Sequence, residues 1–305
     1  MTTTAEPEST TTITTTTTEE AVWMLTGSMN TARYYHTASI LPNGNVLVVG
    51  GDAGWNSAEV YNPFTGFWTT TGTMSTTRLF HTQVTLTNGD VLVAGGTGSR
   101  ITPLSGAEVY NPSKGRWTIT DNMDTARAYH TASILPNGNV LVTGGSGIST
   151  LLSSAEVYNP SKGRWTATGN MNTARFYHTA SILPNGNVLV TGGSGISGSL
   201  SSAEVYNSSK GFWTTTGNMS TTRIFHTQVT LTNGNVIVAG GVTNAFTGVN
   251  STALSSAEVY NPSTGLWTSI GTMSSARAFH TASILANGNV LFAGMGNGSN
   301  AELYG

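Results

Sequence analysis

The chain has no cysteine, few charges and no long apolar run, and each absence removes a class of function. Without cysteine there is no disulfide, no thiolate metal site and no cysteine nucleophile. Charged residues make up 9% of the 305 residues and the net charge is −2, so nothing favours nucleic acid or an anionic membrane as a partner. No apolar run approaches about 18 residues, so no membrane insertion is expected.

The abundant residues indicate β-structure. Gly, Thr, Val, Trp and Tyr are frequent, whereas a helix-rich protein carries far more Glu, Lys and Arg. Residues 1–20 differ from the rest, because eleven of them are Thr and almost none is apolar. We expect a disordered Thr-rich arm or linker at 1–20 and one folded domain at 21–305. The arm resembles an O-glycosylated stalk, and a plain spacer is the alternative.

A unit of about 50 residues is repeated six times, which is typical of repeat folds. Each unit contains one histidine, and the spacings are 45, 49, 48, 48 and 54 residues. The histidines are His36, His81, His130, His178, His226 and His280. An Arg lies three positions before each His, a Met four positions before each Arg, and a Trp six positions before each Met.

Each unit reads as four short strands. In the first unit these are Thr37–Leu41, Asn45–Val49, Ala58–Tyr61 and Phe67–Thr71. The pair Asn43-Gly44 predicts a type I′ hairpin turn between the first two strands. The second strand is apolar almost throughout, so we expect it to be buried on both faces.

Four-stranded units at this period predict an all-β fold, a six-bladed β-propeller of antiparallel blades. The chain ends on a third strand, Ala301–Gly305, with no fourth strand after it. A matching Trp strand, Ala21–Thr26, stands before the first complete unit. We therefore expect Val22–Leu25 to pair with Glu302–Tyr304, so that the N-terminal strand closes the C-terminal blade.

The repeat resembles the kelch motif over residues 21–305. The features that carry the resemblance are a Gly doublet ending the second strand (Gly50-Gly51), a Tyr ending the third (Tyr61), a Trp in the fourth (Trp68) and the sequence M-x-x-x-R that follows (Met74–Arg78). The sixth unit departs from the pattern with Gly294-Met295-Gly296. The resemblance implies protein binding, sometimes carbohydrate binding and occasionally an active site. The copper chemistry of the galactose-oxidase-like branch needs a Cys-linked Tyr, so no cofactor is expected here.

Twelve charged residues follow the repeat. The arginines are Arg33, Arg78, Arg127, Arg175, Arg223 and Arg277, and the glutamates are Glu59, Glu108, Glu156, Glu204, Glu258 and Glu302. The arginines could form an anion-binding ring at the pore mouth, or each could pair with a Glu of its own or the adjacent blade. Equal numbers and identical periodicity favour structural ion pairs.

The six histidines allow a similar pair of interpretations. Imidazoles around an axis could bind a metal or an anion, but six equivalent side chains around a channel lie too far apart for metal coordination. We expect each His to hydrogen-bond to backbone between neighbouring strands instead. No catalytic constellation and no metal site is expected.

Specificity is expected where the units differ, in the loops between the Gly doublet and the third strand. These loops have from six to fifteen residues and should share one face with the Met-to-Arg connections. Trp55, Arg100 and Phe246 are the unusual side chains on them, and we take these three as candidate ligand-binding residues, with variable loop filler as the alternative.

The leading hypothesis is a non-catalytic binding or scaffolding module that interacts with a protein. Near-identical units, such as Met123–Tyr158 and Met171–Tyr206, indicate little divergence towards a unique active site. We expect an extracellular location within a longer protein, although the sequence leaves the cytoplasm open. One alternative is a lectin-like carbohydrate binder that uses Trp55, and another is an enzyme acting on a glycan or peptide in the central funnel.

Overall fold

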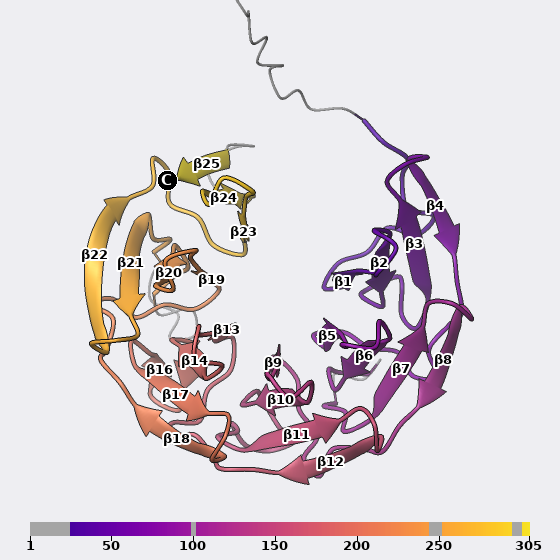
Figure 1. The fold of residues 1–305 in the computed structure, drawn as a ribbon, viewed down its shortest axis with the longest axis horizontal. Helices are drawn as coiled ribbons and strands as arrows, with labels where there is room; N and C mark the ends of the chain where they lie inside the picture. The colour runs from indigo at the N-terminus through magenta and orange to yellow at the C-terminus, as the bar shows by residue number, and fades with distance from the viewer. Residues whose placement is uncertain (1–24, 99–101, 244–251, 295–300) are drawn as a thin grey trace, which may run out of the picture.

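The structure, a computed structural model, describes residues 25–98, 102–243, 252–294 and 301–305. Within these ranges the chain forms strands and no helix, so no helix there is long and apolar enough to cross a membrane. Six antiparallel sheets follow one another around a central axis, each as one blade (Figure 1). The fold is a six-bladed β-propeller, as the repeat predicted.

Each blade is built from strands taken in chain order, from the axis outwards (Figure 1). The first strands are β1 (Thr37–Ile40), β5 (Thr82–Thr85), β9 (Thr131–Ile134), β13 (Thr179–Ile182), β19 (Thr227–Thr230) and β23 (Thr281–Ile284). The second strands are β2 (Val46–Val49), β6 (Val91–Ala94), β10 (Val140–Thr143), β14 (Val188–Thr191), β20 (Val236–Ala239) and β24 (Val290–Ala293). The third strands are β3 (Ala58–Asn62), β7 (Ala107–Asn111), β11 (Ala155–Asn159), β17 (Ala203–Asn207), β21 (Ser256–Asn261) and β25 (Ala301–Tyr304). The fourth strands are β4 (Phe67–Thr70), β8 (Arg116–Ile119), β12 (Arg164–Ala167), β18 (Phe212–Thr215) and β22 (Leu266–Thr272). A small hairpin, β15 (Ser194–Gly195) and β16 (Gly198–Ser199), decorates the fourth blade.

The blade that contains the C-terminus has three strands among the described residues, in the order β23-β24-β25. The strand expected to complete it, Val22–Leu25, lies outside the described residues except for Leu25. The predicted Thr-rich arm, residues 1–20, also lies outside them. In Figure 1 the first and sixth blades stand at the two ends of the arc of sheets.

The first described residues contact the first blade as the end of a preceding fourth strand would. The Gly27 amide donates to the carbonyl of Gly66 at 3.0 Å, and the Thr26 hydroxyl lies 2.6 Å from the Tyr61 hydroxyl. At the next junction Gly72 and Thr71 make the same two contacts, with Gly115 and Tyr110.

The turn between the first two strands differs from the predicted type I′ turn. Gly44 has a φ of 82°, but Asn43 is not among the residues with positive φ. The Gly44 amide donates to the carbonyl of Leu41, and the Leu41 amide donates to that of Asn45. This is a type I turn followed by a left-handed glycine, which suits Pro42 because proline fixes φ near −65°. The Asn-Gly pair predicted a hairpin correctly and its turn type wrongly.

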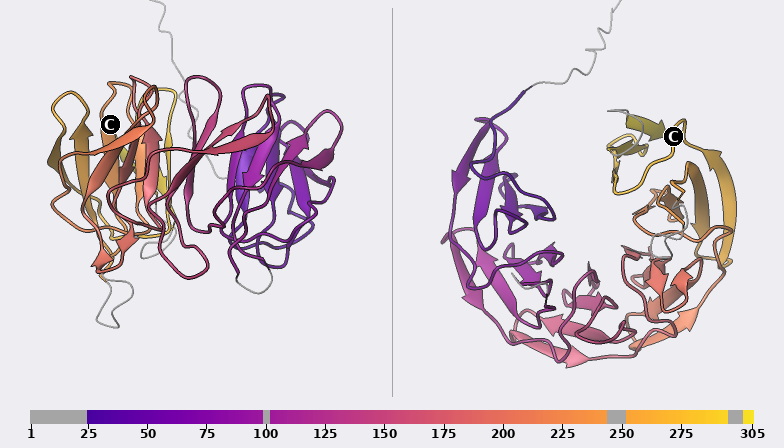
Figure 2. Two further views of the ribbon diagram at one scale, coloured as in Figure 1. Left: turned by 90° about the horizontal axis from the view of Figure 1, so that it is seen from below. Right: turned by 180° about the vertical axis from the view of Figure 1, so that it is seen from behind.

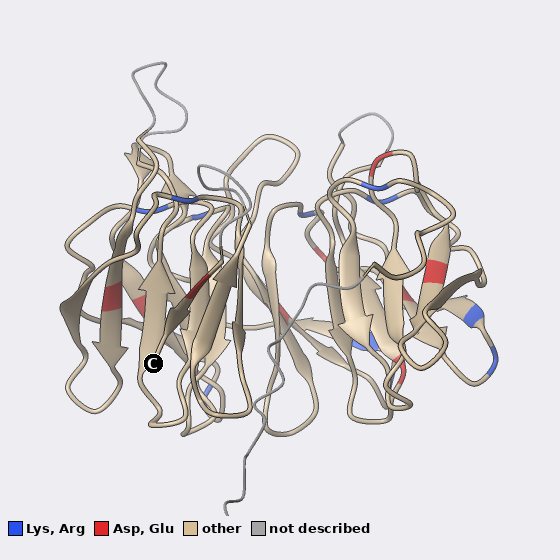
Figure 3. Ribbon diagram, turned by 90° about the horizontal axis from the view of Figure 1, so that it is seen from above, with Lys and Arg blue, Asp and Glu red and all other residues tan. Residues whose placement is uncertain are grey.

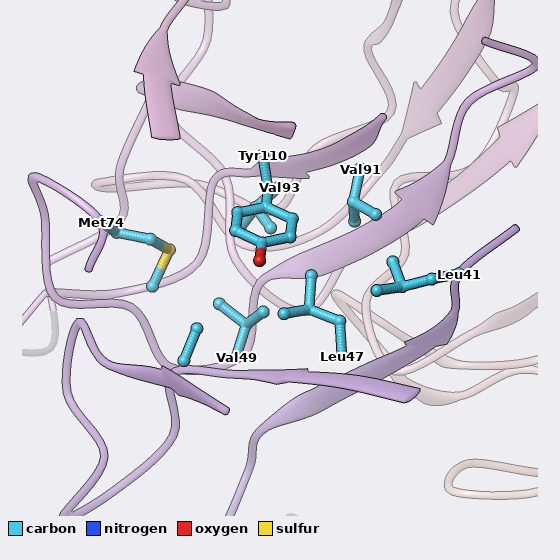
Figure 4. Packing of buried hydrophobic residues seen from close by; sticks show 8 residues of the cluster. Leu41, Leu47, Val49, Met74, Val91, Val93 and Tyr110 are labelled. Atoms are coloured by element: carbon cyan, nitrogen blue, oxygen red, sulfur yellow. The ribbon is translucent and has the colours of Figure 1, made fainter. Parts of the chain in front are cut away.

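The second strand is buried on both faces in the first five blades, as its continuous apolar sequence predicted, whereas in β24 one face, with Leu291 and Ala293, is half-buried. Along β6, Val91 and Val93 pack with the first blade, whereas Leu92 and Ala94 pack with the third. Figure 4 shows Val91 and Val93 facing Leu47 of β2 across the first of these interfaces. Because side chains alternate along a strand, one strand can supply two blade interfaces.

The strands of each blade run between two faces of the ring, where the connections lie (Figure 2). We call the face that carries the Met-to-Arg connections the loop face, and the opposite one, with the Asn-Gly turns, the turn face. In the first five blades a backbone bridge joins the connection to the start of the following variable loop, as at Tyr34 and Asp52 or Leu79 and Thr97. The predicted common face of these segments is confirmed, and Figure 3 shows the row of connection arginines along it.

Candidate functional site

All six repeat arginines form ion pairs with the glutamate on the third strand of the following blade. In the third blade Arg127 Nη2 lies 2.9 Å from Glu156 Oε1, and both side chains are buried. The other pairs are Arg33 with Glu59, Arg78 with Glu108, Arg175 with Glu204, Arg223 with Glu258 and Arg277 with Glu302. Arg127 Nη1 also donates to the carbonyls of Gly144 and Ser154.

These pairs do not form an anion-binding ring. Each guanidinium is enclosed and shares its charge with one carboxylate, which itself accepts backbone hydrogen bonds, as Glu156 does from Asp124 and Thr125. Burial lowers the pKa of Arg127, and the hydrogen bond and charge of Glu156 act in the opposite direction. Each ion pair joins the connection between two blades to the third strand of the following blade, and its role is therefore structural.

Five of the histidines link neighbouring blades. Nε2 of His178 lies 3.0 Å from the Thr131 hydroxyl on the inner strand of the preceding blade. The same bond joins His81 to Thr37, His130 to Thr82, His226 to Thr179 and His280 to Thr227. The partner across the blade interface is therefore a threonine hydroxyl, which the sequence did not indicate. Hydrogen bonds to backbone, as expected from the sequence, act on His81 from Arg78 and on His178 from Arg175. Burial lowers the pKa of each of these histidines, for example that of His178 to about 3.

A row of aromatic rings lies beside the channel axis, on the residue before each histidine. We call these six residues, Tyr35, Phe80, Tyr129, Tyr177, Phe225 and Phe279, the axial collar. Ring centroids of successive members are 4.5, 4.4, 4.6, 4.4 and 3.9 Å apart. The five contacts join the six rings into one continuous row from Tyr35 to Phe279. Each collar residue stands just before the first strand of its blade, the strand nearest the axis (Figure 1).

Every collar residue has a left-handed backbone, with φ between 53° and 58°. Bulky side chains rarely adopt this conformation, and it costs on the order of 1–2 kcal/mol per residue. The residue before each collar member varies, as Leu79, Ala128 and Ile224 show, yet the collar position is aromatic in all six blades.

Sequence reasoning missed the collar, although a signal was present. A Tyr or Phe directly precedes each of the six histidines. What the sequence did not convey was the positive φ and the convergence of six blades on one axis, which together bring these side chains to the mouth of the channel.

Of the three candidate residues predicted from the sequence, Trp55 is described by the structure. Its backbone amide donates to the carbonyl of Gly51, and its carbonyl accepts from the Arg78 amide. Leu104, Leu152, Leu200 and Leu254 make the same pair of bonds in the next four blades. Trp55 thus occupies a repeated loop position, and its side chain is 42% exposed. Arg100 and Phe246 lie outside the described residues.

Further large apolar side chains are exposed on the loop face. Tyr34, Ile148 and Ile196 have 70%, 73% and 96% of their surface exposed. Across the ranges that the structure describes, no group of three or more His, Cys, Asp or Glu side chains is placed to hold a metal ion.

Comparison with known proteins supports the repeat assignment. The kelch motif matches residues 78–123, 127–172 and 226–274. Together with the six blades, these matches show that the chain is a kelch-repeat β-propeller, as the sequence pattern indicated. A search of curated proteins found no match. A solved structure titled "Structure of YjhT" superposes with a TM-score of 0.72 at 15% identity, covering 91% of this chain and 96% of that chain. At that identity the likeness concerns the fold alone.

Proposed function

We propose that the protein is a non-catalytic interaction module that binds a partner protein on its loop face, in an extracellular setting. Kelch-repeat propellers are in general protein-interaction modules, and this chain carries the motif. The observation that supports the choice of face is the exposure of Tyr34, Trp55, Ile148 and Ile196 on it. Exposed aromatic and aliphatic side chains of this kind are typical interface anchors.

The charge distribution fits a neutral interface. The repeat arginines are paired with glutamates beneath the loop face, so they offer no charge to an anionic partner. Charged residues are scarce in the chain as a whole, and Thr and Ser dominate the polar surface. The low charge and the Thr-rich N-terminal sequence motivate the extracellular assignment.

Replacement of Trp55 by leucine is expected to weaken partner binding about tenfold while leaving the melting temperature unchanged. Leucine makes the same pair of backbone hydrogen bonds at this loop position in four other blades, so the variant is expected to keep them and to lose the indole. Trp55 has a positive φ of 49°, which is as unfavourable for tryptophan as for leucine, so the exchange adds no backbone strain. The partner is captured on immobilised protein, identified by mass spectrometry, purified and titrated calorimetrically against wild type and Trp55→Leu.

The matched control is Phe64→Ala, which removes a side chain that is 90% exposed on the turn face. If Phe64→Ala weakens binding and Trp55→Leu with Ile196→Ala does not, the partner uses the turn face and the proposal is wrong. Turnover of any offered glycan or peptide by the purified protein would contradict the non-catalytic assignment.

A further inference from the structure

The axial collar combines backbone strain with an aromatic side chain in every blade. Six left-handed aromatic residues together carry strain that glycine would avoid, since glycine adopts positive φ without a steric penalty. The four inner members of the collar are partly buried, and the end members Tyr35 and Phe279 are 60% and 56% exposed. Strained, partly exposed and invariably aromatic positions are typical of sites where the side chain contacts a ligand.

Three hydroxyl groups add polarity to the collar. The Tyr129 and Tyr177 hydroxyls share a hydrogen bond, and Tyr35 lies near enough to influence both electrostatically, although it belongs to the blade opposite that of Tyr177. Burial raises the pKa of Tyr129 and of Tyr177, so both phenols stay protonated and act as donors as well as acceptors. The phenols of the first, third and fourth blades therefore gather in one region of the channel mouth.

The surroundings of the collar are electrically neutral. The arginine two residues before each collar member is paired with a glutamate, and burial keeps the adjacent histidines His81, His178 and His226 uncharged at neutral pH, with pKa values of about 3. A site of this kind has no free positive charge to attract anions and no free carboxylate to attract cations. It presents aromatic surface and neutral hydroxyl groups.

We propose that the axial collar is a binding site for a neutral saccharide. The C–H face of a sugar ring packs against aromatic rings, and its hydroxyl groups exchange hydrogen bonds with phenols, so the collar meets both requirements. The site lies at the mouth of the axial channel and is separate from the Trp55 loop position. The inference is independent of protein binding on the loop face.

Binding is measured by titration calorimetry with a panel of neutral methyl glycosides, with sialic acid as an anionic probe and tetramethylammonium as a cationic one. At least one neutral glycoside is expected to bind. Tyr177→Phe, which removes a hydroxyl and keeps the ring, is expected to weaken that binding about tenfold, as loss of one or two hydrogen bonds implies. Phe225→Leu should weaken it through loss of aromatic surface, and Phe64→Ala on the turn face should not.

A second variant separates binding from stability. Tyr177→Gly removes the side chain and relieves the left-handed backbone, so it should abolish glycoside binding while the melting temperature stays within roughly 2–4 °C of wild type. A purely structural collar predicts a clear fall in the melting temperature instead. The proposal is overturned if no neutral glycoside binds, if tetramethylammonium or sialic acid binds in their place, or if glycoside affinity survives Tyr177→Phe and Phe225→Leu.

Discussion

Replacement of Arg127 by methionine is expected to lower the free energy of unfolding by about 3–5 kcal/mol. The guanidinium is fully buried, and its removal leaves the Glu156 carboxylate buried without its counter-charge. It also leaves the carbonyl of Gly144 without its donor and removes one of the two donors to the carbonyl of Ser154, which keeps the hydrogen bond from the Gly144 amide. Equilibrium unfolding in urea, monitored by tryptophan fluorescence and by circular dichroism, measures the change.

Two further variants define what the ion pair contributes. Arg164→Met serves as the matched control, because Arg164 forms a solvent-exposed ion pair with Asp121 at 3.7 Å. Its replacement should change the free energy of unfolding by about 0.5 kcal/mol or less. The double variant Arg127→Met with Glu156→Gln removes both charges and is expected to recover part of the loss. If it is no more stable than Arg127→Met, the hydrogen bonds to the two carbonyls carry the stability and the charge pairing does not.

The protein is expected to lose stability steeply as the pH falls from 6.5 towards 4.5. Burial, together with the neighbouring arginines, lowers the pKa of His81, His178 and His226 to about 3 and that of His280 to about 4. The unfolded chain takes up these protons near pH 6.5 and the folded chain does not. The stability is therefore fully present above pH 6.5 and is lost on acidification, by up to about 1.4 kcal/mol per pH unit for each histidine.

The melting temperature measured by calorimetry in steps from pH 8 to pH 4.5 tests this dependence. Carboxylates affect the stability mainly near and below their ordinary pKa of 4.5. The pKa of Glu59 is lower still, because hydrogen bonds from Arg33 and Asn30 outweigh the effect of burial, which raises it. The interval from pH 7 to about pH 5.5 therefore reports mainly on the histidines. His178→Gln keeps a donor for Thr131 without a titrating group, so it should flatten the slope. A melting temperature that is constant from pH 7 to pH 5 would contradict the assignment.

The arginine, histidine and collar variants probe different parts of the same type of connection between blades. Arg127 anchors it to the sheet below, His130 joins it to the preceding blade, and Tyr129 between them faces the channel. The four-residue segment Arg127–His130 thus carries an ion pair, an inter-blade hydrogen bond and an aromatic surface. Because the segment recurs in every blade, the loop face and the channel mouth are built from one repeated element.

Much of the fold was predictable because the repeat is local and complete in each unit. The strand at Val46–Val49 was placed within one residue, since an unbroken apolar run bounded by an Asn-Gly pair and a Gly doublet has few alternatives. The Arg–Glu pairing followed from equal periodicity, because two opposite charges repeated six times in a nearly neutral chain favour each other as partners. The turn at Pro42–Gly44 was misassigned, because three residues join the two strands and not the Asn-Gly pair alone. Units with Thr87 or Ala286 in place of Pro42 make the same turn, so proline is not required for it.

The candidate site was less accessible from the sequence. The residue spacing places Trp55 outside the repeat, because the loops differ in length. Backbone hydrogen bonds show that it shares a position with Leu104 and Leu152. The collar was overlooked for a related reason. From the sequence, an aromatic residue beside a histidine is explained as well by packing between blades as by ligand binding. Its backbone conformation and its position near the axis are needed to distinguish the two.

The sequence by itself determined the number of blades, the order of strands within each blade and the identity of the paired charges. These depend on contacts within one unit or between adjacent units, and the units are nearly alike. The tertiary structure decided which side chains meet at the axis and which hydroxyl each histidine contacts. Those relations arise from the rotation of one blade relative to the next, and no spacing within a single unit encodes that rotation.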